Sequence, residues 1–257
     1  MSDESLSDQP SADDILAFGT YFSALDGHQA LAAIVGRSSD AAFAYVCTPN
    51  AVHVVNYERG EPRFRAGIDG AWLRLCDSRV VARLAATMAG VTLPLALGSD
   101  LTADLLAGAI RPTDAITIIG GTAEMESRLR QQYGWTNVVR HDPPFGFIGD
   151  PAAIAACVNF VVAHPARYVF LACGAPQSEV LGRHIAEHGG AVGTGLCIGA
   201  SLLFATGLQR RAPLFMQRAG LEWLHRLIQE PKRMTTRLRK SQLPILTLAL
   251  RTRLARR

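Results

Sequence analysis

Two glycine-containing junctions in the sequence could bind an anionic ligand. Each joins an apolar, β-rich run to an amphipathic segment, namely IIGGTAEMESRLRQQYG at 118–134 and LACGAPQSEVLGRHIAEH at 171–188. A strand that ends in glycine and leads into a helix presents unpaired backbone N–H groups at the carboxyl edge of a sheet. In the first junction Thr122 is the expected N-cap, and Glu124 lies in the first turn. Because any sheet of this type needs such turns, a purely structural role stays open for each.

The sequence offers no recognisable metal-binding pattern. It contains no Asp-x-Asp pair, and its histidines lack the spacing of metal ligands. The cysteines never form a Cys-x-x-Cys pair, which argues against a disulfide framework and a zinc knuckle; they are Cys47, Cys76, Cys157, Cys173 and Cys197. We therefore predict no metal and no cofactor. Arginines and helix N-termini would have to neutralise a phosphate-bearing substrate, and the cationic last third of the chain supplies arginines.

The elements that would position these junctions follow an alternating pattern between Ala41 and Ala191. Short β-rich runs alternate with longer segments rich in Ala, Leu and Arg, which predicts repeated strand–helix units. The expected strands are AFAYVCT (42–48), AITIIGG (115–121), TNVVRH (136–141), YVFLACG (168–174) and a short AVGTG (191–195). The fold class is therefore α/β, with a Rossmann-like parallel sheet flanked by helices on both faces.

Charge is distributed unevenly along the chain. The formal net charge is only +4, but the N-terminus is acidic, whereas Arg and Lys dominate from Arg210 onward. We expect a disordered acidic N-terminus over 1–15, a Rossmann-like catalytic domain over 16–207 and a basic helical appendage over 208–257. The basic region lacks interleaved aromatic residues and a recognised binding motif, so we predict no nucleic-acid partner.

The basic appendage is predicted to attach the protein to a membrane surface without crossing the bilayer. No apolar run reaches the roughly 18–20 residues that a spanning helix needs, and the acidic start is unlike a signal peptide. The segment KRMTTRLRK carries Arg233, Arg237 and Lys240 on one helical face, and the apolar LPILTLAL follows it. We expect a cytoplasmic protein that associates peripherally with anionic membrane through this tail.

Three sequence blocks resemble those of a known enzyme family. The stretch RRAPLFMQRAGLEWLHRLIQEPKRM (210–234) closely resembles the RAP, GLEW-L-RL and EP-R signature of the WecG/TagA/CpsF glycosyltransferases, glycosyltransferase family 26. GAPQSE (174–179) is similar to the family's Gly-x-Pro-Lys-Gln-Glu turn, with Gln177 in place of Lys and Ser178 in place of Gln. TPNAVHVV (48–55) is similar to its Thr-x-Asn segment. The resemblance covers most of the chain and implies a Rossmann-like domain with a C-terminal appendage that completes the active site.

The resemblance places the general base on Asp77. In the matching block, AGIDGAWLRLCDSRVV (66–81), the family's usual Ala-Asp-Gly reads Cys76-Asp77-Ser78. An Asp followed by Ser-Arg-Val-Val could instead only cap a helix. Asp69, in the sequence IDG, is the nearest rival and is expected to be a turn residue.

The substrate-binding residues also follow from the resemblance. Thr48 and Asn50 would line the sugar or acceptor pocket, with an Asx or Thr turn as the alternative. The turn residues Gly174, Pro176, Gln177 and Glu179 would contact the nucleotide or sugar, and simple capping of the next helix is the alternative for the last two. The signature arginines Arg211, Arg226 and Arg233 would grip the diphosphates of donor and lipid carrier, or they could form a solvated basic face.

The reaction that the resemblance implies is an inverting, metal-independent transfer of a sugar. The donor would be a UDP-sugar and the acceptor a saccharide linked to undecaprenyl diphosphate, in the biosynthesis of a cell-surface polysaccharide such as an exopolysaccharide. The expected partners are therefore the UDP-sugar, the polyprenyl-diphosphate-linked sugar and the anionic membrane surface. The sequence does not give the oligomeric state, and because related enzymes assemble, a homo-oligomer stays open.

Two departures from the family pattern leave other functions open. Leu95 stands where members commonly carry Arg, and Leu203 stands where the pattern has Asp. Such a chain could be a catalytically altered member that acts as a non-enzymatic partner in a polysaccharide assembly complex. A dinucleotide-dependent oxidoreductase is a further alternative, because Gly193, Gly195 and Gly199 have a loosely dinucleotide-like spacing.

Overall fold

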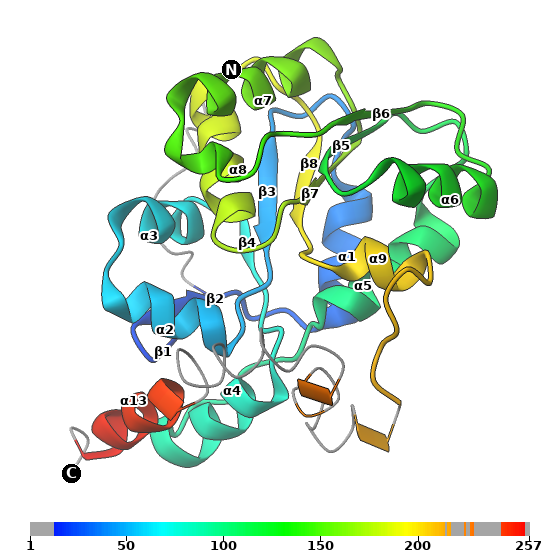
Figure 1. Ribbon diagram of the computed structural model, residues 1–257. Helices are drawn as coiled ribbons and strands as arrows, with labels where there is room; N and C mark the ends of the chain where they lie inside the picture. Colours follow the sequence, from blue (N-terminus) through cyan, green and yellow to red (C-terminus); the bar gives the residue numbers. More distant parts are fainter. Residues whose placement is uncertain (1–12, 214, 217–223, 225–226, 229–242, 255–257) are drawn as a thin grey trace.

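The computed structural model describes residues 13–213, 215–216, 224, 227–228 and 243–254. Within them, six parallel strands form a central sheet in the order β4-β3-β8-β7-β5-β6 (Figure 1). The strands are β3 (Ala44–Cys47), β4 (Leu73–Arg74), β5 (Ile116–Gly120), β6 (Val138–His141), β7 (Tyr168–Ala172) and β8 (Thr194–Cys197). The predicted α/β class with a parallel sheet is therefore confirmed.

Both faces of the sheet are buried, and the strand sequences show why. Along β7, Tyr168 and Phe170 enter one apolar cluster, whereas Val169 and Leu171 enter another on the opposite face. Successive side chains of a strand point to opposite faces, so a strand covered on both sides must be apolar at every position. This is why YVFL is a continuous apolar run rather than an alternating one.

Helices cover the two faces of the sheet (Figure 1). The helices α1 (Gly27–Gly36), α5 (Gly98–Asp104), α6 (Ala123–Tyr133) and α9 (Ser201–Ala205) contribute to the first cluster. The helices α3 (Pro62–Asp69), α7 (Pro151–Ala163) and α8 (Gln177–His188) contribute to the second. The predicted N-cap Thr122 is confirmed, because its side chain accepts the N–H of Met125 at 3.1 Å and so begins α6.

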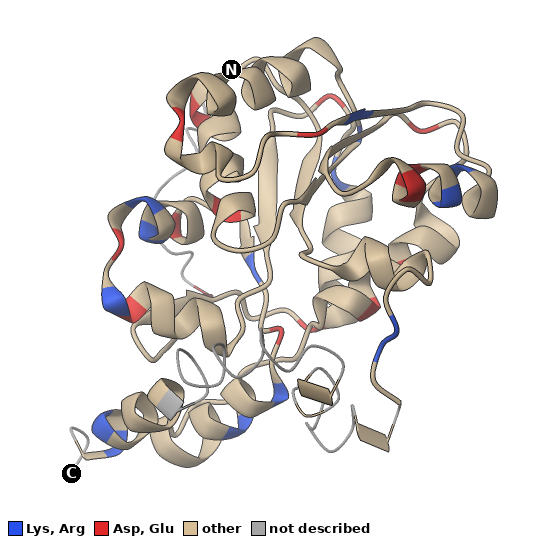
Figure 2. Ribbon diagram, viewed as in Figure 1, with Lys and Arg blue, Asp and Glu red and all other residues tan. Residues whose placement is uncertain are grey.

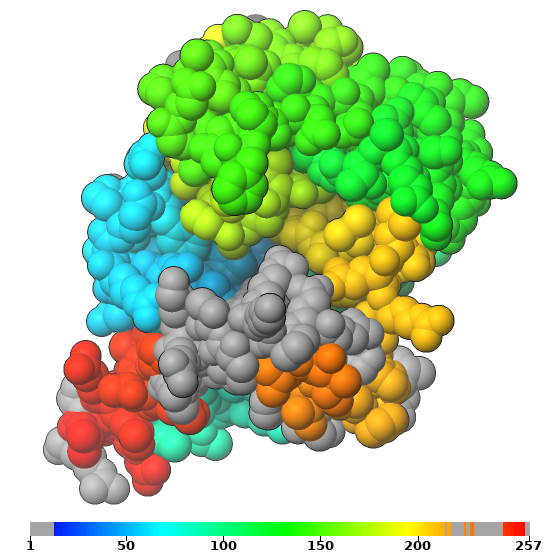
Figure 3. Space-filling model, viewed as in Figure 1, coloured from blue at the N-terminus to red at the C-terminus, as the bar shows by residue number. Residues whose placement is uncertain are grey.

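A third apolar cluster lies beyond the carboxyl ends of β3 and β4. It is built by α2 (Ala51–Arg59), α4 (Arg79–Leu84), the π-helical turn η1 (Ala85–Ala89) and α13 (Leu243–Leu254). Lys and Arg positions occur on both α4 and α13 at this end of the molecule (Figure 2). The space-filling view shows α13 packed beside α2 and α4 (Figure 3). The last described helix is therefore part of the packed structure.

The structure also contains two strands that were not predicted from the sequence, and one predicted strand begins later than expected. An antiparallel hairpin joins β1 (Ile15–Ala17) to β2 (Thr20–Phe22), with positive φ at both turn residues, Phe18 and Gly19. The predicted strand 191–195 was placed too early, since β8 begins at Thr194. The physical reason is Gly193, whose φ of +87° forms a turn tight enough that a Cβ there would lie 2.0 Å from the carbonyl oxygen of Ala166.

Among the described helices, none combines the length and the apolar character that crossing a bilayer would require. The basic segment 232–240 lies outside the described residues. The boundaries proposed for the three regions of the chain stay predictions.

Candidate active site

The sequence-predicted site residues follow neighbouring strands at one edge of the sheet. Thr48 and Asn50 come directly after β3, Asp77 comes three residues after β4, and the 174–179 turn follows β7. The strands are parallel, so all these segments leave the sheet at the same, carboxyl edge. In open α/β sheets this edge is where ligands bind.

Asp77 is held between two neighbouring segments. Its backbone N–H donates to the carbonyl oxygen of Pro49 at 3.0 Å, and its Oδ1 accepts the N–H of Gly98 at 3.0 Å. It does not cap α4: that cap is Ser78, whose Oγ accepts the N–H of Val81 at 3.2 Å. Asp77 therefore does not cap α4, and its half-buried carboxyl group accepts the first N–H of α5 instead.

Gly98 brings Asp77 close to Thr48. A Cβ atom at Gly98 would lie 3.1 Å from Oγ1 of Thr48, so a larger residue there would require Thr48 or the start of α5 to shift. Thr48 is buried, and its Oγ1 donates to the carbonyl oxygen of Cys197 at the end of β8, at 3.3 Å. Hydrogen bonds thus connect the segments that follow β3 and β4 with the end of β8.

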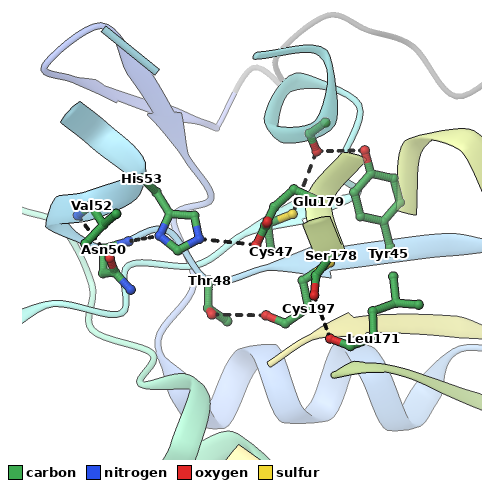
Figure 4. Close-up of polar contacts among 11 residues, drawn as sticks. Tyr45, Cys47, Thr48, Asn50, Val52, His53, Leu171, Ser178, Glu179 and Cys197 are labelled. Atoms are coloured by element: carbon green, nitrogen blue, oxygen red, sulfur yellow. Dashed lines mark hydrogen bonds and ion pairs between the residues drawn. The ribbon is translucent and has the colours of Figure 1, made fainter. Parts of the chain in front are cut away.

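Asn50 starts α2 and connects to a buried polar pair (Figure 4). Its Oδ1 accepts the N–H of Val52 at 3.0 Å, so the Asx-type capping predicted as the alternative is present. The backbone N–H of Asn50 donates to Nδ1 of His53 at 3.3 Å, and Nε2 of His53 lies 3.2 Å from Oε1 of Glu179. Since Nδ1 accepts the Asn50 N–H, Nε2 is the ring nitrogen that donates to Glu179.

The side chain of Glu179, the last residue of the 174–179 turn, is buried in the protein. It is only 2% exposed, and its Oε2 has no hydrogen-bond partner within the described part of the chain. The thiol groups of Cys47 and Cys197 lie within 4.8 Å of its carboxyl group. Burial raises the pKa of Cys47 and raises that of Cys197 well above its usual value, which favours protonated S–H groups over metal-binding thiolates. Contact between Glu179 and a nucleotide or sugar stays a prediction.

The 174–179 turn begins with Gly174 at a φ of +77° and contains a cis peptide bond between Ala175 and Pro176. In the orientation that satisfies its hydrogen bonds, the amide nitrogen of Gln177 lies 3.1 Å from the carbonyl oxygens of Gly174 and Ala175. Ser178 is buried and donates from Oγ to the carbonyl oxygen of Leu171 at 2.8 Å, which fixes the start of α8 to β7. Neither Gln177 nor Glu179 caps α8, so the capping alternative does not account for them.

Of the three predicted arginines, the structure describes Arg211. Its Nη1 lies 2.5 Å from Oδ1 of Asp100 in the first turn of α5. That turn begins with Gly98, which also donates to Asp77. The segment after α9 therefore returns to the predicted site. Arg226 and Arg233 lie outside the described residues.

The glycine pattern of the oxidoreductase alternative has a packing role. A dinucleotide-binding glycine loop follows its strand, but Gly193 precedes β8 and Gly195 lies within it. A Cβ at Gly195 would lie 2.5 Å from the ring of Phe43. These glycines therefore allow close contact with β3 and the segment before β7, and they do not form a phosphate-binding loop.

Two residues of the site were not predicted as such. His53 follows Asn50 by three positions, the spacing of a capping box, which is the one local signal that could have identified it. Gly98 has no local sequence signal for its role beside Asp77. Of the two departures from the family pattern, Leu203 packs against the first apolar cluster, whereas Leu95 is 37% exposed.

The fold and the site together define the class of protein. A parallel sheet covered on both faces, with Thr48 and the buried Glu–His pair at its carboxyl edge (Figure 4), defines a Rossmann-like α/β protein, a class in which ligands bind at that edge. The sequence profile of the Glycosyl transferase WecG/TagA/CpsF family matches residues 15–257. The chain therefore belongs to this family and is a glycosyltransferase, whose substrates are a sugar donor and an acceptor.

Proposed function

We propose that the protein is an inverting, metal-independent transferase that moves a sugar from a UDP-sugar to a saccharide linked to undecaprenyl diphosphate. Asp77 acts as the general base. The observation that supports this most directly is the bond from Gly98 N–H to Oδ1 of Asp77, which orients the carboxylate beside Thr48. In this family context the product belongs to a cell-surface polysaccharide, such as an exopolysaccharide.

The proposed step is a single displacement. The acceptor hydroxyl oxygen attacks the anomeric carbon as its proton passes to the Asp77 carboxylate, and the bond from that carbon to the UDP oxygen breaks. The electron pair leaves with UDP, whose charge is neutralised by Arg211 together with Arg226 and Arg233. Thr48 and Asn50 line the sugar side of the pocket, and the turn from Gly174 to Gln177 contacts the nucleotide. Glu179 positions Asn50 through His53.

The transfer takes place at the inner face of the plasma membrane, and α13 supports a peripheral attachment. Leu246, Leu250 and Leu254 are 47%, 53% and 69% exposed and follow each other at intervals of four residues. This spacing places them on one helical face. Ile245 and Ala249 are buried in the third cluster, so α13 is fixed to the body by its other face. Arg251 and Arg253 add positive charge next to the exposed leucines.

The central experiment compares Asp77→Asn with Asp69→Asn in a UDP-release assay that contains several UDP-sugars and a short-chain lipid-diphosphate sugar. Asp69 is a matched control, because its Oδ1 accepts a hydrogen bond from the hydroxyl of Tyr57 at 2.7 Å and an amide oxygen can replace it. We expect Asp77→Asn to slow the transfer by about 10²–10⁴-fold and Asp69→Asn to leave it within about twofold. Equal rates for the wild type and Asp77→Asn would refute the general-base role. Wild-type protein that binds both substrates without turnover would favour the non-enzymatic partner.

Membrane attachment is tested separately by flotation with vesicles of anionic or zwitterionic lipid. Replacing Leu246, Leu250 and Leu254 with Gln should abolish flotation with anionic vesicles. Because these three side chains are exposed, the substitutions should leave the third apolar cluster intact. Replacing the exposed Leu16 of β1 with Gln is the control. Equal flotation of the triple variant and the wild type would exclude α13 as the attachment site.

A further inference from the structure

A cationic pocket that the proposed mechanism does not use lies beside Asp77. It has a volume of about 390 Å³ and lies between α4–η1 and the segment 92–95. The residues that line it are Arg79, Ala82, Arg83, Ala86, Thr92, Leu93 and Leu95. The two arginines are four positions apart and so share one helical face. In the part of the chain that the structure describes, neither guanidinium group makes a hydrogen bond or an ion pair.

Both walls of this pocket are anchored next to Asp77. Arg79 comes two residues after Asp77 on one wall, and Leu95 on the other wall forms a parallel β-bridge with Cys76. The N–H of Ala96 also donates to the carbonyl oxygen of Cys76 at 3.1 Å. The pocket therefore borders the segment that carries the carboxylate proposed to activate the acceptor.

The lining of the pocket combines two charges with an apolar rim. Guanidinium groups bind phosphate oxygens with directed hydrogen bonds and full charge. Leu93, Leu95 and the two alanines offer no hydrogen-bond donors or acceptors from their side chains, which suits a hydrocarbon chain better than a nucleoside.

We propose that Arg79 and Arg83 bind the diphosphate group of the lipid-linked acceptor, with the first isoprene units against Leu93 and Leu95. The identity of this ligand rests on the proposed transferase function. The arrangement presents the acceptor sugar to Asp77 from the α4 side, while the donor approaches from the 174–179 turn. Because η1 also packs against α13, the lipid leaves the pocket at the end of the molecule that carries the exposed leucines of α13.

The test is a binding measurement that requires no turnover. Calorimetric titrations with geranyl diphosphate and with UDP are performed on the wild-type protein, Arg79→Gln/Arg83→Gln and a control, Arg63→Gln/Arg111→Gln. The control changes the net charge equally at two exposed positions away from the pocket. We expect the first variant to weaken geranyl diphosphate binding roughly tenfold or more, a loss of about 1.4 kcal/mol, and to leave UDP binding within about twofold. The charge-preserving Arg79→Lys/Arg83→Lys should recover part of the affinity.

Several outcomes would overturn the assignment. They are unchanged geranyl diphosphate affinity in the Gln variant, an equal loss of affinity for UDP, or no binding of geranyl diphosphate to the wild type. Circular dichroism melting curves of each variant exclude unfolding as the cause of a loss. The transferase proposal fails on a different result, namely UDP release that does not depend on Asp77. The two can therefore be refuted independently.

Discussion

The buried pair of His53 and Glu179 allows a quantitative test of how the site is held together. His53 connects Asn50, at the start of α2, to a carboxyl group that is 2% exposed and 126 residues further along the chain. Replacing His53 with Ala removes the only hydrogen-bond partner that Glu179 Oε1 has among the described side chains, and it leaves the Asn50 N–H without its acceptor. We expect this single change to destabilise the protein and to loosen the active site.

The expected magnitude follows from the burial of both groups. Replacing His53 with Ala leaves both the Glu179 carboxyl group and the Asn50 N–H without this partner, and each buried group left unpaired costs about 1–3 kcal/mol. Replacing Glu179 with Leu removes the acceptor instead and should cost about 1–3 kcal/mol, since it leaves one buried N–H of His53 unpaired. The double variant has neither the unpaired Glu179 carboxyl group nor the unpaired His53 N–H, so its loss should be smaller than the sum of the two single losses by about 1–3 kcal/mol.

The assay is urea unfolding of the four proteins in the cycle, followed by circular dichroism. Replacing the exposed His28 of α1 with Ala is the matched control and should change the free energy of unfolding by less than about 0.5 kcal/mol. The same preparations are used to measure transfer. We expect His53→Ala to lower kcat more than the binding of UDP at temperatures where it stays folded, because it removes the hydrogen bond to Asn50 at the end of β3, whereas UDP is proposed to contact the turn from Gly174 to Gln177.

Additive losses would contradict this account. If the double variant loses as much stability as the two single variants combined, His53 and Glu179 do not interact across the site. A His53→Ala protein of wild-type stability would likewise show that the carboxyl group finds another partner, and that the hydrogen bonds to Asn50 and Glu179 are not what holds α2 to α8.

Two further predictions concern close packing and thiol chemistry. Replacing Gly98 with Ala should reduce the transfer rate about tenfold, because the new Cβ contacts Thr48 and moves the N–H that orients Asp77. The loss of stability should be small, since alanine favours the helix by up to about 1 kcal/mol. A wild-type rate would show that the close contact between Gly98 and Thr48 does not matter for transfer. Burial raises the pKa of both Cys76 and Cys173 to about 12, so the native protein should react slowly with a thiol reagent at pH 8 and faster as the pH rises. In guanidinium all its thiols should react. A thiol that reacts rapidly in the native protein at pH 8 would contradict this prediction.

The main strands and the fold class could be predicted from the sequence because their signals are local. The runs AITIIGG and YVFLACG are apolar at successive positions and end in glycine, and Thr122 has the side chain that begins a helix. The hairpin of β1 and β2 could not be predicted in the same way, since Phe18 occupies a positive φ that usually favours glycine or asparagine. The two-residue strand β4 is too short to show any periodicity.

Site residues could be predicted only where they belong to a short recognisable sequence motif. The blocks around Thr48, Asp77 and the 174–179 turn have recognisable sequences, and the structure brings them to one edge. The bond between His53 and Glu179 joins residues from two distant blocks, and nothing in either block specifies the other. The Arg79–Arg83 pocket depends on how α4 packs against the segment 92–95, which is a tertiary feature.

The third apolar cluster joins opposite ends of the described chain. Phe22 of β2 and Ile245 of α13 are both fully buried in it, together with Val54 of α2. A ribosome adds Ile245 long after Phe22, so this end of the molecule cannot finish folding during most of translation. Prematurely terminated products would present Phe22 and Val54 to solvent next to the carboxyl edge of the sheet, which would make them substrates for proteases and chaperones.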